Sequence, residues 1–143
     1  RAGLHNIETR ALSNESNKWI KRHAGQFDLV LVDAPCTGSG TWRRMPDARW
    51  RTLGPSMEEL VVMQRNILDS AARLVKPGGR LVYATCSLLP EENNAQVSAF
   101  LGGHSDFAQR GEAVQMTPLR HATDGFFVAT MMRKAKEKEA ATP

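Results

Sequence analysis

Residues 81–94 read LVYATCSLLPEENN, and the interpretation of the whole chain starts from this stretch. A short apolar run ends at Tyr83, a cysteine follows at Cys86, and Pro90 precedes an acidic, amide-rich segment typical of the start of a helix. Open α/β sheets place their functional groups in the crevice above the carboxyl ends of the strands. Cys86 is therefore a candidate functional residue.

A strand, a helix and a second strand are predicted around this stretch. Residues 27–32, FDLVLV, predict a strand that is covered on both faces. In residues 56–75, Ser56 and Glu59 form a capping box and apolar residues recur at helical spacing, which predicts a long amphipathic helix. KPGG at 76–79 is expected to end that helix before a strand at 80–84. This order predicts a βαβ unit in a parallel sheet.

The N-terminal part of the chain gives fewer signals. Residues 6–12 suggest a strand, and residues 13–23 suggest a short helix or loop with Ser13 and Asn14 as candidate N-caps. The chain begins at Arg1 without a methionine or a signal-peptide pattern, so we expect a piece of a longer protein.

The C-terminal part predicts a helix and a hairpin. Residues 91–101 are expected to be helical, with Glu91 and Glu92 in the first turn, where the helix dipole favours acidic groups. Segments 116–120 and 126–132 are expected to be strands joined by a turn at 123–125, closing the sheet edge. Residues 134–143, KAKEKEAATP, are expected to be a disordered charged tail, which leaves residues 1–133 as the folded part.

Composition bounds the class of protein. The 143 residues are 41% apolar and contain no run near the roughly 18 residues of a membrane span, so we expect a soluble, cytoplasmic domain with no membrane partner. The net charge of +4 permits a polyanionic partner without requiring one. Two cysteines and four scattered histidines argue against a structural metal site and against a disulfide framework.

Polar segments follow both strands of the βαβ unit: DAPC at 33–36 and ATCS at 84–87. Because neighbouring strands lie about 4.8 Å apart, Cys36 and Cys86 are expected to face one crevice. A single free cysteine is more often a small core residue, whereas two at adjacent strand ends favour a reactive pair. A helix after Cys86 would add a field that favours its thiolate. Asp33 either caps the loop or binds a ligand or proton.

Residues 34–51 form an irregular loop and then an arginine-rich segment. The proline and glycines of APCTGSG at 34–40 allow a backbone to approach a ligand closely. TWRRMPDARWR at 41–51 contains four arginines and two tryptophans, which suit phosphate contacts and base stacking. The alternative is a surface loop with its tryptophans packed into the core.

Taken together, these motifs closely resemble the Sun/Nop family of RNA 5-methylcytosine methyltransferases. The resemblance covers about residues 27–133, and its carriers are DAPCTGSG (33–40), RR and PD (43–47), KPGG (76–79), YATCS (83–87), PEEN (90–93) and TDGFF (123–127). It implies the C-terminal half of a Rossmann-like methyltransferase fold, α/β with a mostly parallel sheet and an antiparallel C-terminal hairpin.

The resemblance also implies site roles and ligands. Cys86, in the TC motif, would attack carbon 6 of cytosine, and Cys36, in the PC motif, would aid product release. Asp33 and Pro35 would contact the cofactor, S-adenosylmethionine. The expected substrate is single-stranded or looped RNA, with ribosomal RNA favoured. The RNA-contact candidates are Trp42, Arg43, Arg44 and Arg49.

The chain departs from the family pattern at its N-terminal end. The family's glycine-rich cofactor loop, the following acidic residue and the catalytic-domain lysine have no match in residues 1–26, and Ser13 and Asn14 stand where an Asp is often found. The chain is therefore expected to lack most of the cofactor pocket and to be inactive alone. Two alternatives stay open: a non-catalytic RNA-binding domain, and a redox pair of Cys36 and Cys86.

Overall fold

The βαβ unit predicted from the sequence forms the centre of the fold. The computed structural model describes residues 3–12, 18–50 and 54–135. Strands β1 (Phe27–Asp33) and β2 (Val75–Thr85) pair in parallel, and helix α2 (Met57–Ala72) connects them. The remaining elements, in chain order, are α1 (Lys18–Arg22), the 3-10 helices η1 (Ser39–Thr41) and η2 (Pro46–Trp50), α3 (Asn94–Gly103), β3 (Phe107–Gln109), β4 (Val114–Met116), α4 (Pro118–His121) and β5 (Phe126–Arg133).

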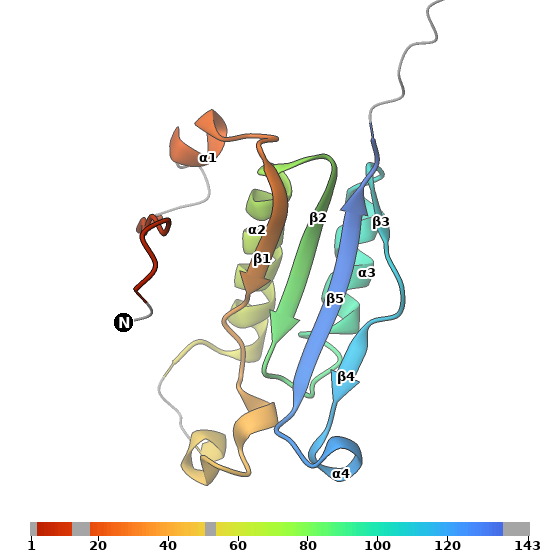
Figure 1. The fold of residues 1–143 in the computed structure, drawn as a ribbon. Coiled ribbons are helices and arrows are strands. Elements are labelled where there is room, and N and C mark those ends of the chain that lie inside the picture. Colours follow the sequence, from red (N-terminus) through yellow and green to blue (C-terminus); the bar gives the residue numbers. More distant parts are fainter. Residues whose placement is uncertain (1–2, 13–17, 51–53, 136–143) are drawn as a thin grey trace, which may run out of the picture.

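The five strands form one sheet in the order β1-β2-β5-β3, with β4 also paired to β5. β5 is antiparallel to β2, β3 and β4, so parallel pairing among the described strands is confined to β1 and β2. Helices α2 and α3 cover the same face of this sheet (Figure 1). The predicted antiparallel pairing at the C-terminal end is confirmed by β4 and β5, but the first strand is at 114–116 rather than 116–120.

The start of α2 follows the predicted capping box. The Ser56 hydroxyl accepts a hydrogen bond from the Glu59 N–H, and the Ser56 N–H donates one to the Glu59 carboxylate. The predicted end was wrong, because α2 stops at Ala72 and Val75 already belongs to β2. The KPGG segment lies inside β2 as an irregularity, where the register with β1 jumps between Val75 and Arg80.

The core lies between the sheet and the two helices. Its largest fully buried apolar side chains come from β2, β5 and α2: Tyr83, Phe127, Leu68, Leu81 and Met131. Each such side chain contributes about 1.5–3 kcal/mol of transfer free energy relative to exposure. This packing fixes the strand ends from which the site is built.

The prediction that β1 is covered on both faces was wrong for this chain. Val32 is buried against the helices, but Leu31 is 63% exposed and Leu29 is also exposed. β1 is an edge strand of the described sheet, and no described helix covers its second face. Val32 is the one buried residue of β1, so the strand is not the continuous buried run that the sequence predicted.

Several boundaries differ from the sequence predictions. Residues 6–12 form no strand, and residues 116–120 are mostly the short helix α4. Strand β3 lies between the predicted helix 91–101 and the predicted strand 116–120, where no strand is predicted. The second helix begins at Asn94, after a turn, so Glu91 and Glu92 do not lie in its first turn. Ser13, Asn14 and residues 136–143 lie outside the described residues, so the predictions made for them stay untested.

Candidate active site

The two cysteines meet at the carboxyl ends of the parallel strands, as predicted. Cys86 directly follows β2, and Cys36 lies in the loop after β1. Their sulfur atoms are 3.4 Å apart, although the residues are fifty positions apart in the sequence. Both are free thiols and both are partly buried. The parallel register, which pairs Asp33 with Ala84, is what brings the two loops together.

Burial has the largest influence on the ionisation of Cys36. Burial raises the pKa of Cys36 to about 12, and the hydrogen bond and charge of Cys86 act in the same direction. Backbone N–H groups near Gly38 and Cys86 oppose this shift without cancelling it. At neutral pH Cys36 is therefore a protonated thiol that can donate a hydrogen bond to the Cys86 sulfur.

A buried glutamate joins the loops that carry the cysteines. The Glu92 carboxylate accepts hydrogen bonds from the Thr37 backbone N–H at 2.9 Å and the Thr37 hydroxyl at 2.7 Å. It also accepts one from the Ser87 hydroxyl and one from the Gln64 amide at 3.0 Å. Thr37 follows Cys36 and Ser87 follows Cys86, so one side chain is bonded to both loops.

Asn93 adds a second set of contacts beside Cys86. Its side-chain oxygen accepts a hydrogen bond from the Thr85 hydroxyl at 2.6 Å, and its amide donates to the Ser87 carbonyl at 2.9 Å. The same amide donates to the Gln115 side chain at 3.0 Å, which ties the loop to β4. Thr85 and Ser87, on either side of Cys86, are thereby fixed.

Gly40 and Gly125 allow the loop that contains Pro35 and Cys36, here called the PC loop, to lie against the turn before β5. The Gly40 N–H donates to the Cys86 carbonyl at 2.9 Å, and the Gly125 N–H donates to the Gly40 carbonyl at 2.8 Å. A Cβ atom on Gly40 would lie 2.1 Å from the Gly125 oxygen, so no side chain fits there. The predicted irregular loop 34–40 is correct up to Gly38, after which η1 begins at Ser39.

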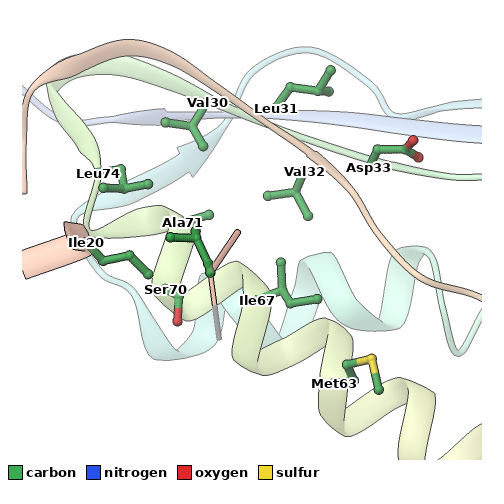
Figure 2. A pocket seen from close by; sticks show the side chains of 11 residues that line it. Ile20, Val30, Leu31, Val32, Asp33, Met63, Ile67, Ser70, Ala71 and Leu74 are labelled. Carbon is green, nitrogen blue, oxygen red and sulfur yellow. The ribbon is translucent and has the colours of Figure 1, made fainter. Parts of the chain in front are cut away.

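Asp33 and Pro35 lie at the exposed end of β1. Asp33 is at the rim of an apolar cavity of about 590 Å³ between β1 and α2. In Figure 2, Asp33 lies near one end of this cavity, while Leu74 and Ile20 lie near the other. Its walls are mainly aliphatic, with Val32 and Ile67 on facing elements. Asp33 is thus an acidic group at the end of an open apolar groove.

The arginine-rich segment divides into two groups. Arg44 Nε lies 2.5 Å from Asp124 Oδ2, and Arg43 Nη2 lies 3.5 Å from Asp124 Oδ1. Asp124 is buried, so these two arginines are anchored to the turn before β5. The sequence predictions missed this role of Asp124.

Arg49 belongs to a stack with two tryptophans. Its guanidinium carbon lies 5.8 Å from the Trp42 ring centre and 5.1 Å from the Trp50 ring centre, within the range of cation–π attraction. Trp50 is 74% exposed. The alternative that both tryptophans pack into the core was therefore wrong for Trp50.

The sequence predicts Glu92 only as an acidic residue in the first turn of a helix, and Asn93 only as part of the PEEN motif. Both are almost completely buried and form the hydrogen bonds around the cysteines. The available signal was the acidic, amide-rich composition of residues 91–94 directly after a cysteine loop.

Within the described ranges, no group of three or more His, Cys, Asp or Glu residues is placed to hold a metal ion. None of the described helices has the length and apolar character required to cross a membrane.

Comparisons with known proteins agree on one group of relatives. The sequence profile of the family described as 16S rRNA methyltransferase RsmB/F matches residues 1–132. Ribosomal RNA small subunit methyltransferase B of Shewanella oneidensis is 44% identical over 117 residues, which are 76% of this chain and 27% of that protein. The chain thus spans about a quarter of the length of the curated relatives it matches.

Solved structures agree with the predicted fold class. The crystal structure of PH0851 superposes with a TM-score of 0.71 at 42% identity, covering 76% of this chain and 27% of that one. NSun6 from Pyrococcus horikoshii, whose crystal structure contains SFG, an analogue of S-adenosylmethionine, gives a TM-score of 0.61 at 28% identity, covering 75% and 30%. The Rossmann-like α/β prediction is therefore confirmed.

Proposed function

Because the chain belongs to the RsmB/F family of 16S rRNA methyltransferases, we propose that it carries the catalytic cysteines of an S-adenosylmethionine-dependent RNA cytosine C5-methyltransferase. Membership in this family confirms the resemblance that the cysteine motifs indicated. The observation that carries the proposal is the 3.4 Å distance between the Cys36 and Cys86 sulfurs at the ends of two parallel strands. Two thiols so placed can act on one base.

Cys86 is the proposed nucleophile. Carbon 5 of cytosine is a poor nucleophile until a sulfur bonds to carbon 6 and electron density shifts toward carbon 5. S-adenosylmethionine, when bound, supplies the methyl group. The base must leave any stack to reach a partly buried thiol, so single-stranded or looped RNA is the proposed substrate, with ribosomal RNA favoured by the names of the relatives.

Cys36 is the proposed residue of the release step. Release requires loss of the proton on carbon 5, re-formation of the C5–C6 double bond, and departure of the Cys86 sulfur with the electron pair of its bond to carbon 6. The charge and hydrogen bond of Cys86 contribute to the raised pKa of Cys36. When Cys86 is bonded to the base it carries no charge, so the pKa of Cys36 should fall, and the thiolate form of Cys36 is the proposed acceptor of that proton.

Asp33 and Pro35 are the proposed cofactor contacts. A carboxylate at the rim of an apolar cavity of about 590 Å³ suits a ligand that is cationic at one end, as S-adenosylmethionine is. The relative NSun6 with SFG supports the same cofactor class. Residues 1–26 contain no match to the glycine-rich cofactor loop of the family, so we propose that residues 1–133 are the C-terminal half of a catalytic domain in a longer protein and are inactive alone.

RNA contact is proposed for Trp42, Arg43, Arg44 and Arg49. The stack of Arg49 with two indoles, one of them 74% exposed, suits phosphate contact together with base stacking. The same stack also favours the second candidate, an RNA-binding domain without catalysis. RNA binding that is steeply salt-dependent, without any methylation by the full-length protein, would favour this second candidate.

The test of the proposed function is transfer of a labelled methyl group to RNA by the full-length protein that contains this chain. Wild-type protein should label cytosine, and Cys86→Ala should reduce the rate to background because no other group replaces the nucleophile. Full activity in Cys86→Ala would refute the role of Cys86.

A further inference from the structure

We propose that Glu92 is the positioning residue that holds the Cys36 and Cys86 loops at the separation needed for two-cysteine catalysis. The proposal rests on the proposed function for its meaning, but its structural part can be tested without catalysis. Glu92 contacts neither sulfur in the described hydrogen bonds. It acts through its hydrogen bonds to Thr37 and Ser87.

Both carboxylate oxygens of Glu92 accept hydrogen bonds from the two cysteine loops and from α2. Oε1 accepts from the Thr37 N–H and the Gln64 amide, and Oε2 accepts from the Thr37 and Ser87 hydroxyls. The side chain is fully buried, and these described partners are uncharged. Four donors converge on two oxygens, which is an arrangement that only a carboxylate satisfies.

The position of Glu92 is itself fixed from two sides. Gln64 of α2 donates to the Pro35 carbonyl at 2.9 Å as well as to Glu92, so α2 is bonded to the PC loop and to the glutamate together. Tyr83 of β2 donates its hydroxyl to the Glu92 backbone carbonyl at 2.7 Å. The carboxylate therefore cannot shift without breaking contacts to the helix and to the central strand.

A fixed separation matters because the two sulfurs act on neighbouring ring atoms. Cys86 is proposed to bond to carbon 6 and Cys36 to act at carbon 5, so both must reach one base in the same geometry. A misplacement of about 1 Å can reduce a reaction rate by roughly 100-fold. Loss of Glu92 should move the loops apart even if the sheet and helices remain folded.

The first test uses the distance between the sulfurs directly. In the full-length protein, the azo oxidant diamide should convert the neighbouring thiols to a Cys36–Cys86 disulfide; two thiols lose two protons and two electrons, and the azo group becomes a hydrazine. Glu92→Gln keeps the size of the side chain but turns an amide N–H₂ toward donors. We expect disulfide formation, measured by mass spectrometry of the linked peptides, to slow at least about tenfold.

Glu91→Gln is the matched control, because Glu91 is the exposed neighbour and undergoes the same chemical change. It should leave the rate of disulfide formation unchanged. If Glu92→Gln does not fold, as judged by circular dichroism, Thr37→Val serves instead, since it removes only the hydroxyl bond to Glu92. An unchanged rate of disulfide formation in folded Glu92→Gln, or in Thr37→Val when the glutamine variant is unfolded, would overturn the proposal.

The second test separates positioning from general stability. Glu92→Gln should lower kcat for RNA methylation about tenfold or more while KM for RNA stays within about twofold, because the RNA-contact segment is untouched. A rise in KM with kcat unchanged would overturn the positioning role. If wild-type protein methylates no RNA but the disulfide rates differ as expected, the loop-positioning role stands and the proposed function fails.

Discussion

The sulfur atom of Cys36 lies 3.4 Å from that of Cys86, and burial raises the pKa of Cys36 to about 12. Cys36 therefore ionises less readily than an ordinary cysteine. The raised pKa of Cys36 leads to a direct prediction about its reactivity.

Cys36 should resist alkylation at pH values where an ordinary cysteine reacts. Its usual pKa is 9.0, so at pH 9 an ordinary thiol is half ionised, whereas a pKa of about 12 leaves roughly one part in a thousand as the reactive thiolate. Rates of labelling by iodoacetamide between pH 7 and 10, measured by mass spectrometry, check this. An apparent pKa near 9 for Cys36 would contradict it.

The Cys86→Ala variant is the control for the titration of Cys36. The raised pKa of Cys36 also makes the folding stability depend on pH. Removing Cys86 removes its contribution to the shift, so the pKa of Cys36 should fall while burial keeps it above 9.0. The folded protein holds this proton more tightly than the unfolded chain does. The resulting stabilisation is present below about pH 9 and is lost as the pH rises toward 12.

Gly40→Ala should destabilise the protein by about 1–3 kcal/mol, because the new Cβ would overlap the Gly125 backbone oxygen. Urea unfolding followed by circular dichroism measures the change. Gly102→Ala is the control: it lies in α3, and its Cβ would meet nothing within 4 Å, so the substitution should be neutral or stabilising by about 0.5–1 kcal/mol. Equal stability of the two variants would contradict the close approach of the loops.

Trp50→Ala should weaken RNA binding by the full-length protein by about 1–3 kcal/mol, the usual value of one base–aromatic stack. Trp50 is 74% exposed and is not part of the core, so the fold should be retained. Fluorescence anisotropy with single-stranded RNA at a fixed salt concentration measures the change, and Trp50→Phe should recover part of the loss. Identical affinities for wild type and Trp50→Ala would remove Trp50 from the RNA interface.

The elements predicted correctly are those whose sequence signals lie within a few consecutive residues. The capping box at Ser56, the apolar runs of β1 and β2, and the cysteines at their ends were all visible in short segments, and the βαβ rule brought the thiols together. The exposure of Leu31 could not be predicted, because it depends on which elements cover β1 rather than on β1 itself.

The hydrogen-bonded part of the site was missed for a related reason. The partners of Glu92 are 55, 28 and 5 positions away along the chain, so no spacing rule identifies them. Asp124 is likewise 81 positions from Arg43. Strand β3 has three residues, too few for a period-2 pattern to stand out.

The central claim is that Cys86 bonds to the base and Cys36 releases it, and the most direct test is a covalent adduct. The full-length Cys36→Ala variant, incubated with RNA and S-adenosylmethionine, should accumulate a protein–RNA species that migrates slowly on a denaturing gel. The double variant Cys36→Ala/Cys86→Ala should form none. An adduct that persists in the double variant, or no adduct in Cys36→Ala despite RNA binding, would contradict the account.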